Sequence, residues 1–105
     1  MSVIVTVTVV GNPGLLEAHA DAHPEDMHAV RDRAIEHGVI AHRFYGSHGR
    51  IMVTDEWPDE QSFERFRDEA NPEIEAILGA AGISSEPEIV LWRQLDTHDE
   101  IGWDA

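Results

Sequence analysis

The sequence contains no cysteine. Disulfide bonds, thiolate nucleophiles and cysteine-bound zinc or iron–sulfur centres are therefore excluded, and any metal would need histidine or carboxylate ligands. Basic residues are also few, because 7 Lys plus Arg stand against 21 Asp plus Glu for a formal net charge of -14. This balance repels phosphate backbones and anionic lipid, so we expect neither a nucleic-acid partner nor a membrane partner.

Long apolar runs and short catalytic signatures are absent as well. The apolar stretch 3–10 is too short to span a bilayer, alternates with Thr6 and Thr8, and lacks the basic leader and cleavage site of a signal peptide. We therefore expect a strand there and a cytoplasmic protein. No glycine-rich phosphate loop, nucleophile elbow or basic patch with interleaved aromatic residues is found, so nucleophilic catalysis is not predicted.

What the sequence does contain is a regular order of strands and helices. Four strand-like runs, at 3–10, 39–45, 50–57 and 86–94, are separated by two amphipathic helical blocks in the order strand, helix, strand, strand, helix, strand. This order predicts one α+β domain over residues 1–95, a ferredoxin-like βαββαβ unit with a four-stranded antiparallel sheet and its helices on one face. A chain of 105 residues is long enough for one core.

Residues 96–105 form an acidic tail outside this pattern. Ile101 and Trp103 are large apolar residues in this polar stretch. We expect the tail to pack on the domain or on a second protomer, and the alternative is a free tail.

Proline and glycine mark the helix ends. Pro24 suits the first turn of a helix that runs to about His37. The second helical block starts after Asp59 and is expected to stop at Asn71 and Pro72, where Asn71 would cap a short third helix.

The segment between the second and third strands predicts a hairpin. Its loop is the four-residue stretch 46–49, which places Tyr45 opposite Arg50. In this register His42 and Asp55 are diagonal neighbours on one face of the sheet. That face is the more apolar, so we expect it to face the helices and any cavity, and a second subunit to pack on the other face.

The element order and two sequence stretches resemble the antibiotic biosynthesis monooxygenase group of the dimeric α+β barrel superfamily. The first stretch is the hairpin from 42–45 to 50–53, and the second is 55–57 leading into 62–66. The resemblance implies a homodimer that joins two sheets into a barrel, with a small hydrophobic, often aromatic or polyketide-like molecule held between sheet and helices. Known activities in the group include cofactor-independent oxygenation, isomerisation, cyclisation and haem degradation, so fold analogy does not choose the reaction.

Haem degradation fits the residues poorly. Members of that branch place an Asn on the first strand and a haem-ligating His on the helix after the third strand, with a Trp nearby. Trp57 is a candidate for the Trp, but the first strand offers Thr6 and Thr8, and 59–70 contains no His. We therefore expect no haem, and the resemblance to a group that includes cofactor-independent oxygenases implies that no organic cofactor is needed.

His42 is the main candidate for chemistry. An imidazole on an apolar face needs a hydrogen-bond partner, and Asp55 is in reach. The carboxylate would set the tautomer of His42, which as a general base would remove an acidic substrate proton and so begin an oxygenation or a cyclisation. The alternative is a core histidine that ties two strands together. Four aromatic side chains are candidates either for substrate binding or for plain core packing: Phe44, Trp57, Phe63 and Phe66.

Histidine spacing also allows a metal site. His19 and His23 would share one face of a continuous helix, although Pro24 disfavours helical geometry at His23. If the chain bends there, both converge with His42 as three nitrogen ligands for a transition metal. Two hypotheses follow: an oxygenase-like enzyme, which the family resemblance favours, or a non-enzymatic module that binds a small ligand or metal through these three histidines.

Overall fold

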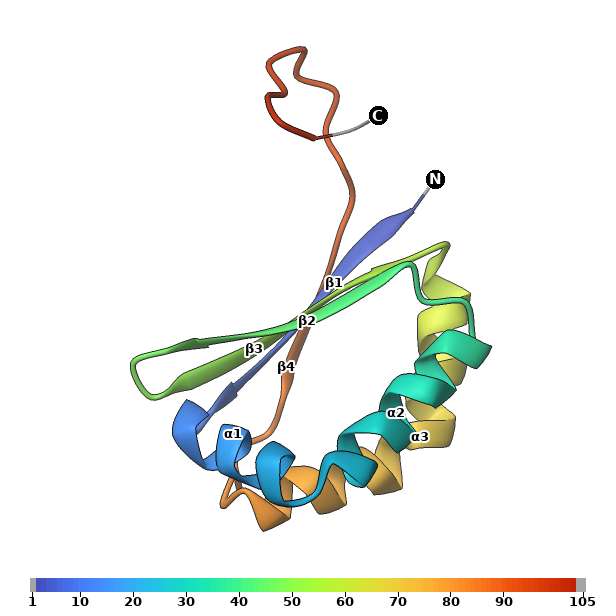
Figure 1. Cartoon of the computed structure of the whole chain (residues 1–105). Helices are drawn as coiled ribbons and strands as arrows, with labels where there is room; N and C mark the ends of the chain where they lie inside the picture. Colours follow the sequence, from blue (N-terminus) through green and yellow to red (C-terminus); the bar gives the residue numbers. More distant parts are fainter. Residues whose placement is uncertain (1, 104–105) are drawn as a thin grey trace.

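Among the residues that the structure describes, three helices cover one face of a four-stranded sheet and no helix covers the other face (Figure 1). The computed structural model describes residues 2–103; Met1 of the predicted domain, and Asp104 and Ala105 of the predicted tail, lie outside them. The elements in chain order are β1 (Val3–Val10), α1 (Pro13–Ala22), α2 (Pro24–Glu36), β2 (Ala41–Ser47), β3 (Arg50–Trp57), α3 (Glu60–Ala80) and β4 (Glu88–Trp92). This order confirms the predicted ferredoxin-like fold.

The sheet has the strand order β2-β3-β1-β4, and each neighbouring pair is antiparallel. Side chains on β1 alternate between faces, so Val5 and Val9 are buried under the helices while Thr6 and Thr8 lie on the uncovered face. We call this uncovered face the outer face. On this face a side-chain hydrogen bond also connects β4 to β1: the Trp92 indole donates to Thr6 Oγ1 at 2.8 Å.

The β2–β3 turn is tighter than predicted. β2 continues to Ser47, which pairs with Arg50, so the turn consists of His48 and Gly49 alone. Gly49, the second residue of this turn, has φ +69, a left-handed geometry that glycine adopts without strain. Consequently Tyr45 does not pair with Arg50, and the predicted register is wrong by two residues.

A shift of two residues leaves every side chain on its predicted face, because the side-chain period of a strand is also two. The inward face of the hairpin is therefore as predicted. His42 pairs directly with Asp55 instead of diagonally. The tighter turn thus brings the two predicted site residues closer than the sequence indicated.

The helices differ from prediction at two places. A separate helix, α1, precedes the one predicted from Pro24: Asn12 caps it by accepting a hydrogen bond from Gly14 N at 2.9 Å, and Pro13 is its first residue. α1 ends at Ala22, and α2 begins at Pro24 as predicted.

α3 runs without a break through Pro72, so the predicted short third helix does not exist. An interior proline costs a helix about 3 kcal/mol. Buried residues occur along α3 both before and after this point, from Phe63 to Ile77, and their packing on the sheet outweighs the local cost. At its start, the Asp59 carboxylate accepts from Ser62 N at 2.7 Å, and this backbone hydrogen bond lowers the pKa of Asp59.

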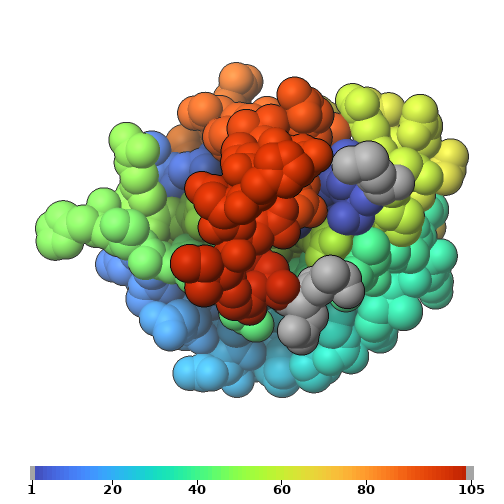
Figure 2. All heavy atoms as spheres, turned by 90° about the horizontal axis from the view of Figure 1, so that it is seen from above, coloured from blue at the N-terminus to red at the C-terminus, as the bar shows by residue number. Residues whose placement is uncertain are grey.

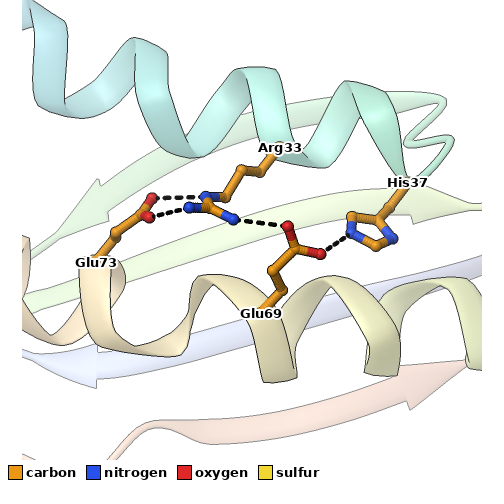
Figure 3. Close-up of polar contacts among 4 residues, drawn as sticks. All are labelled: Arg33, His37, Glu69 and Glu73. Carbon is orange, nitrogen blue, oxygen red and sulfur yellow. Dashed lines mark hydrogen bonds and ion pairs between the residues drawn. The ribbon is translucent and has the colours of Figure 1, made fainter.

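A polar network ties α2 to α3 (Figure 3). The Arg33 guanidinium donates from Nε to Glu73 at 3.0 Å and from Nη1 to Glu69 at 2.7 Å, and His37 Nε2 lies 2.7 Å from the other Glu69 oxygen. Hydrogen bonding to Glu73 raises the pKa of Arg33. The contact with His37, together with Arg33, lowers the pKa of Glu69.

The chain after β4 has no helix or strand in its described part. In Figure 1 it runs away from the sheet, and in Figure 2 it stands in front of the body of the molecule. Ile101 is 89% exposed and Trp103 85% exposed, so these residues do not pack on their own domain. Within residues 2–103, no helix is long and apolar enough to cross a membrane.

Candidate active site

The space between sheet and helices is not fully packed. Two clusters of buried side chains form the core, one around Trp57 and Phe66 and the other around Val9 and Leu16. Between them lies a cavity of about 350 Å³, the size of a small-molecule site, whose walls are largely aliphatic. A more open hollow of about 550 Å³ lies at the hairpin tip beside Pro13 and His48.

Two polar side chains in the wall of this cavity, His42 and Asp55, are hydrogen-bonded to each other, and Asp55 also to the buried Trp57. His42 Nδ1 lies 2.6 Å from Asp55 Oδ1, and Trp57 Nε1 donates to the other carboxylate oxygen at 3.2 Å. The side chain of Asp55 is 6% exposed and that of His42 is 29% exposed. Both line the cavity, whereas Trp57 is fully buried behind them.

This geometry sets the tautomer of His42. An ionised carboxylate only accepts hydrogen bonds, so the proton of the neutral imidazole lies on Nδ1 and points at Asp55. Nε2 is left with its lone pair free to accept a proton. The buried carboxylate compensates the positive charge that would then form on the ring, as in other His–carboxylate pairs.

The strand pattern explains why these residues meet. Asp55 and Trp57 are two apart on β3 and therefore share a face, while His42 is opposite Asp55 on β2. β2 is an edge strand with every residue exposed to some degree, so the imidazole is reachable from outside. The sequence predicted the His42–Asp55 contact but not the indole hydrogen bond.

Three of the four predicted substrate-binding aromatic residues line the cavity: Phe44, Phe63 and Phe66. Phe44 packs edge-on against His42, with ring centroids 5.3 Å apart. Trp57 does not line the cavity and instead follows the core-packing alternative, because it is 0% exposed and packs against Phe63 and Phe66. Its contribution to the site is the hydrogen bond that orients the carboxylate of Asp55.

The three histidines predicted as metal ligands do not form one cluster. The rings of His19 and His23 are neighbours, with centroids 5.1 Å apart, but within residues 2–103 His42 does not complete a metal-binding group with them. His19 Nε2 contacts Asp26 at 3.1 Å, and His23 Nδ1 contacts Glu25 at 3.2 Å, at the junction of α1 and α2. Among residues 2–103, no three His, Cys, Asp or Glu side chains are arranged to hold a metal ion. A backbone hydrogen bond, and then His23, lower the pKa of Glu25.

Sequence reasoning missed several polar residues at the cavity: His28, Arg31, Arg67 and Asn71. None of these four residues was predicted to belong to the site. A helical signal existed for two of them, because Arg67 and Asn71 follow Phe63 at intervals of four residues and so share its side of α3.

Comparison with known proteins identifies the fold. No family model and no curated protein matches this chain. Among solved structures, SnoaB, a cofactor-independent oxygenase from Streptomyces nogalater, is 18% identical with a TM-score of 0.58, covering 94% of this chain and 97% of its own. A dimeric ferredoxin-like protein from an uncultured marine organism is 11% identical with a TM-score of 0.65, covering 95% of this chain and 93% of its own.

A Deinococcus radiodurans protein assigned to the antibiotic biosynthesis monooxygenases is 14% identical, with a TM-score of 0.65 and coverage of 95% of this chain and 99% of its own. The fold is thus that of antibiotic biosynthesis monooxygenase-like, ferredoxin-like proteins. At these identities the likeness establishes the fold, and the chemistry is argued from the site.

Proposed function

We propose that this protein is an oxygenase-type enzyme that acts without an organic cofactor on a small hydrophobic, aromatic substrate held in the cavity. The observation that carries the proposal is the contact of His42 with a buried carboxylate at the wall of an apolar cavity. The site thus combines a base whose free nitrogen is available with walls suited to an aromatic ring. SnoaB, which shares the fold, is described as a cofactor-independent oxygenase.

In the proposed reaction His42 Nε2 removes a proton from an acidic CH₂ group of the substrate. The electron-rich carbanion then reduces dioxygen and forms a C–O bond, which gives a hydroperoxide once a proton returns. Loss of water from the hydroperoxide leaves a carbonyl group. One oxygen atom of O₂ enters the product and the other leaves as water, so atoms and electrons balance with O₂ as the only co-reactant.

Anthrone is a suitable probe because its ring methylene is acidic and its oxidation to anthraquinone consumes O₂. We expect the protein to raise O₂ uptake with anthrone above the spontaneous rate. We expect His42→Ala to return uptake to that rate while circular dichroism stays unchanged. His98→Ala, in the exposed tail, is the matched control and should keep full activity.

Unchanged O₂ uptake in the His42→Ala variant would refute His42 as the base. Absence of any uptake above background with wild-type protein would instead favour the second candidate, a non-enzymatic small-ligand binding module. The largely apolar walls of the cavity support that candidate too, because they suit ligand retention without turnover.

We also propose that the protein forms a homodimer through the outer face of the sheet. Large apolar side chains gather there without a cover, since Ile4 is 36% exposed, Tyr45 47% and Trp92 53%. Thr54 Oγ1, on the same face, is buried and lacks a hydrogen-bond partner among the described residues. The marine ferredoxin-like protein of the same fold is described as dimeric.

A further inference from the structure

Two of the three charged residues at the cavity have the opposite sign to the net charge of the protein. The chain has a formal net charge of -14. At the cavity, however, the charged lining residues are Arg31, Arg67 and Asp55. Both carboxylate oxygens of Asp55 already have hydrogen-bond partners, His42 and Trp57. The charged groups that remain available to a ligand at the cavity are therefore the positive ones.

Arg67 is the arginine that is free to meet a ligand there. Arg31 donates two hydrogen bonds to the carboxylate of Asp32, at 3.2 and 3.1 Å. Arg67 makes no hydrogen bond or ion pair with any residue in the range 2–103. This is notable on a helix rich in acidic residues. Figure 3 shows why two of them are occupied: Glu69 and Glu73 are held by Arg33 on the other helix.

The position of Arg67 relates it to the rest of the site. It lies one turn after Phe63 and one turn before Asn71, and all three line the cavity. An aromatic ring held against Phe63 would thus place a substituent beside the guanidinium. A guanidinium forms two parallel hydrogen bonds with a carboxylate, which gives both affinity and orientation.

We propose that the cavity selects aromatic acids: Arg67 binds a carboxylate on the substrate, and the ring lies among the aromatic residues near His42. This inference rests on the proposed function, of which it names the substrate class. Arg67 is the residue that determines specificity in this assignment. His42 acts on the ring system, and Arg67 holds the substituent and thereby the orientation of the ring.

The test compares two probes with one ring system, 2-naphthoate and the neutral 2-naphthalenemethanol, by isothermal titration calorimetry. Wild-type protein should bind the acid more tightly, on the order of tenfold, because a charged hydrogen-bonded pair is added. Rising salt concentration should reduce this preference, since Arg67 is exposed. Arg67→Gln should abolish the preference and leave the affinity for the alcohol unchanged, which also shows that the cavity is intact.

Arg65→Gln is the matched control, because Arg65 lies on the same helix but does not line the cavity. It should retain the preference for the acid. Equal affinities of wild-type protein for the two probes, or equal effects of the two substitutions, would overturn the Arg67 assignment but leave an oxygenase with a neutral substrate. Failure of both probes to bind would overturn the cavity as a site for aromatic ligands and thus both proposals. An Arg67-dependent preference in a protein that consumes no O₂ would overturn the oxygenase alone.

Discussion

At the scale of single residues, the carboxylate of Asp55 is held from both sides. His42 occupies one oxygen and Trp57 the other, so the carboxylate cannot rotate without losing a hydrogen bond. Burial makes each lost bond costly, about 1–3 kcal/mol for an unsatisfied polar atom. The consequence is a fixed imidazole whose free nitrogen has a defined direction.

Replacing Asp55 by Asn should remove activity without unfolding the protein. The Asn oxygen would still accept from Trp57, but its amide group would donate to His42 Nδ1. The imidazole proton would then move to Nε2, which could no longer act as a base. We expect turnover of anthrone to fall by about 10²-fold or more, and nitrogen-15 NMR of the histidine side chains to show the changed tautomer.

Asp26→Asn provides the control, because Asp26 also contacts a histidine, His19 Nε2 at 3.1 Å, but does not line the cavity. Its substitution should leave turnover intact. If Asp55→Asn turns over anthrone at the wild-type rate although the tautomer has changed, then Nε2 of His42 is not the proton acceptor.

At the scale of elements, the contact between α2 and α3 depends on ionised Glu69. Its carboxylate joins Arg33 and His37, which both lie on the α2 side (Figure 3). The pKa of Glu69 is lowered from its ordinary value of 4.5, first by the hydrogen bond with His37. The unfolded chain therefore binds this proton more readily than the folded one.

The sign of the pH effect follows from that difference. A lowered pKa contributes stability that is fully present above 4.5 and is lost as the pH falls through the folded value. Glu69→Gln should reduce the free energy of unfolding near neutral pH. The difference in this free energy between the variant and wild type should become smaller as the pH falls below 4.5.

Urea titrations at a fixed protein concentration across this range measure this difference. Glu64→Gln is the control, since Glu64 is an exposed residue of α3 outside the network, and it should show no such decrease. If the difference in free energy of unfolding between Glu69→Gln and wild type stays constant with pH, the ionised network does not contribute to stability.

At the scale of the whole molecule, the two faces of the sheet have different roles. The inward face carries the cavity and its polar centre, while the outer face carries the exposed apolar side chains proposed as a dimer interface. A charge placed among those side chains should prevent association, because a buried unpaired charge is costly.

Trp92→Glu should therefore convert the dimer to a monomer in sedimentation-velocity experiments. Ile35→Glu tests the same change on α2, at a position 58% exposed and away from the outer face, and should remain dimeric. Wild-type protein that sediments as a monomer would refute the proposed interface. Association of Trp92→Glu to the same extent as wild type would place the interface elsewhere.

The order of elements, the facing of the strands and the His42–Asp55 pair could be predicted from the sequence alone. All depend on local periodicity. The face assigned to each side chain was correct despite a two-residue error in register, because side chains on a strand alternate with a period of two. The helix start at Pro24 is similarly local, since proline is favoured in a first helical turn.

Tertiary packing decided the rest. Whether α3 could pass through Pro72 depended on what lay beneath it, and the placement of Arg67 at the cavity depended on how that helix lies over the sheet. The hydrogen bond from Trp57 to Asp55 required the indole to be buried in the orientation that the core imposes. The amino-acid sequence thus specifies which residues share a face, and which meet across a short hairpin, because backbone geometry repeats locally. Contacts between segments far apart in the chain follow only from the packed structure, because packing sets their relative positions.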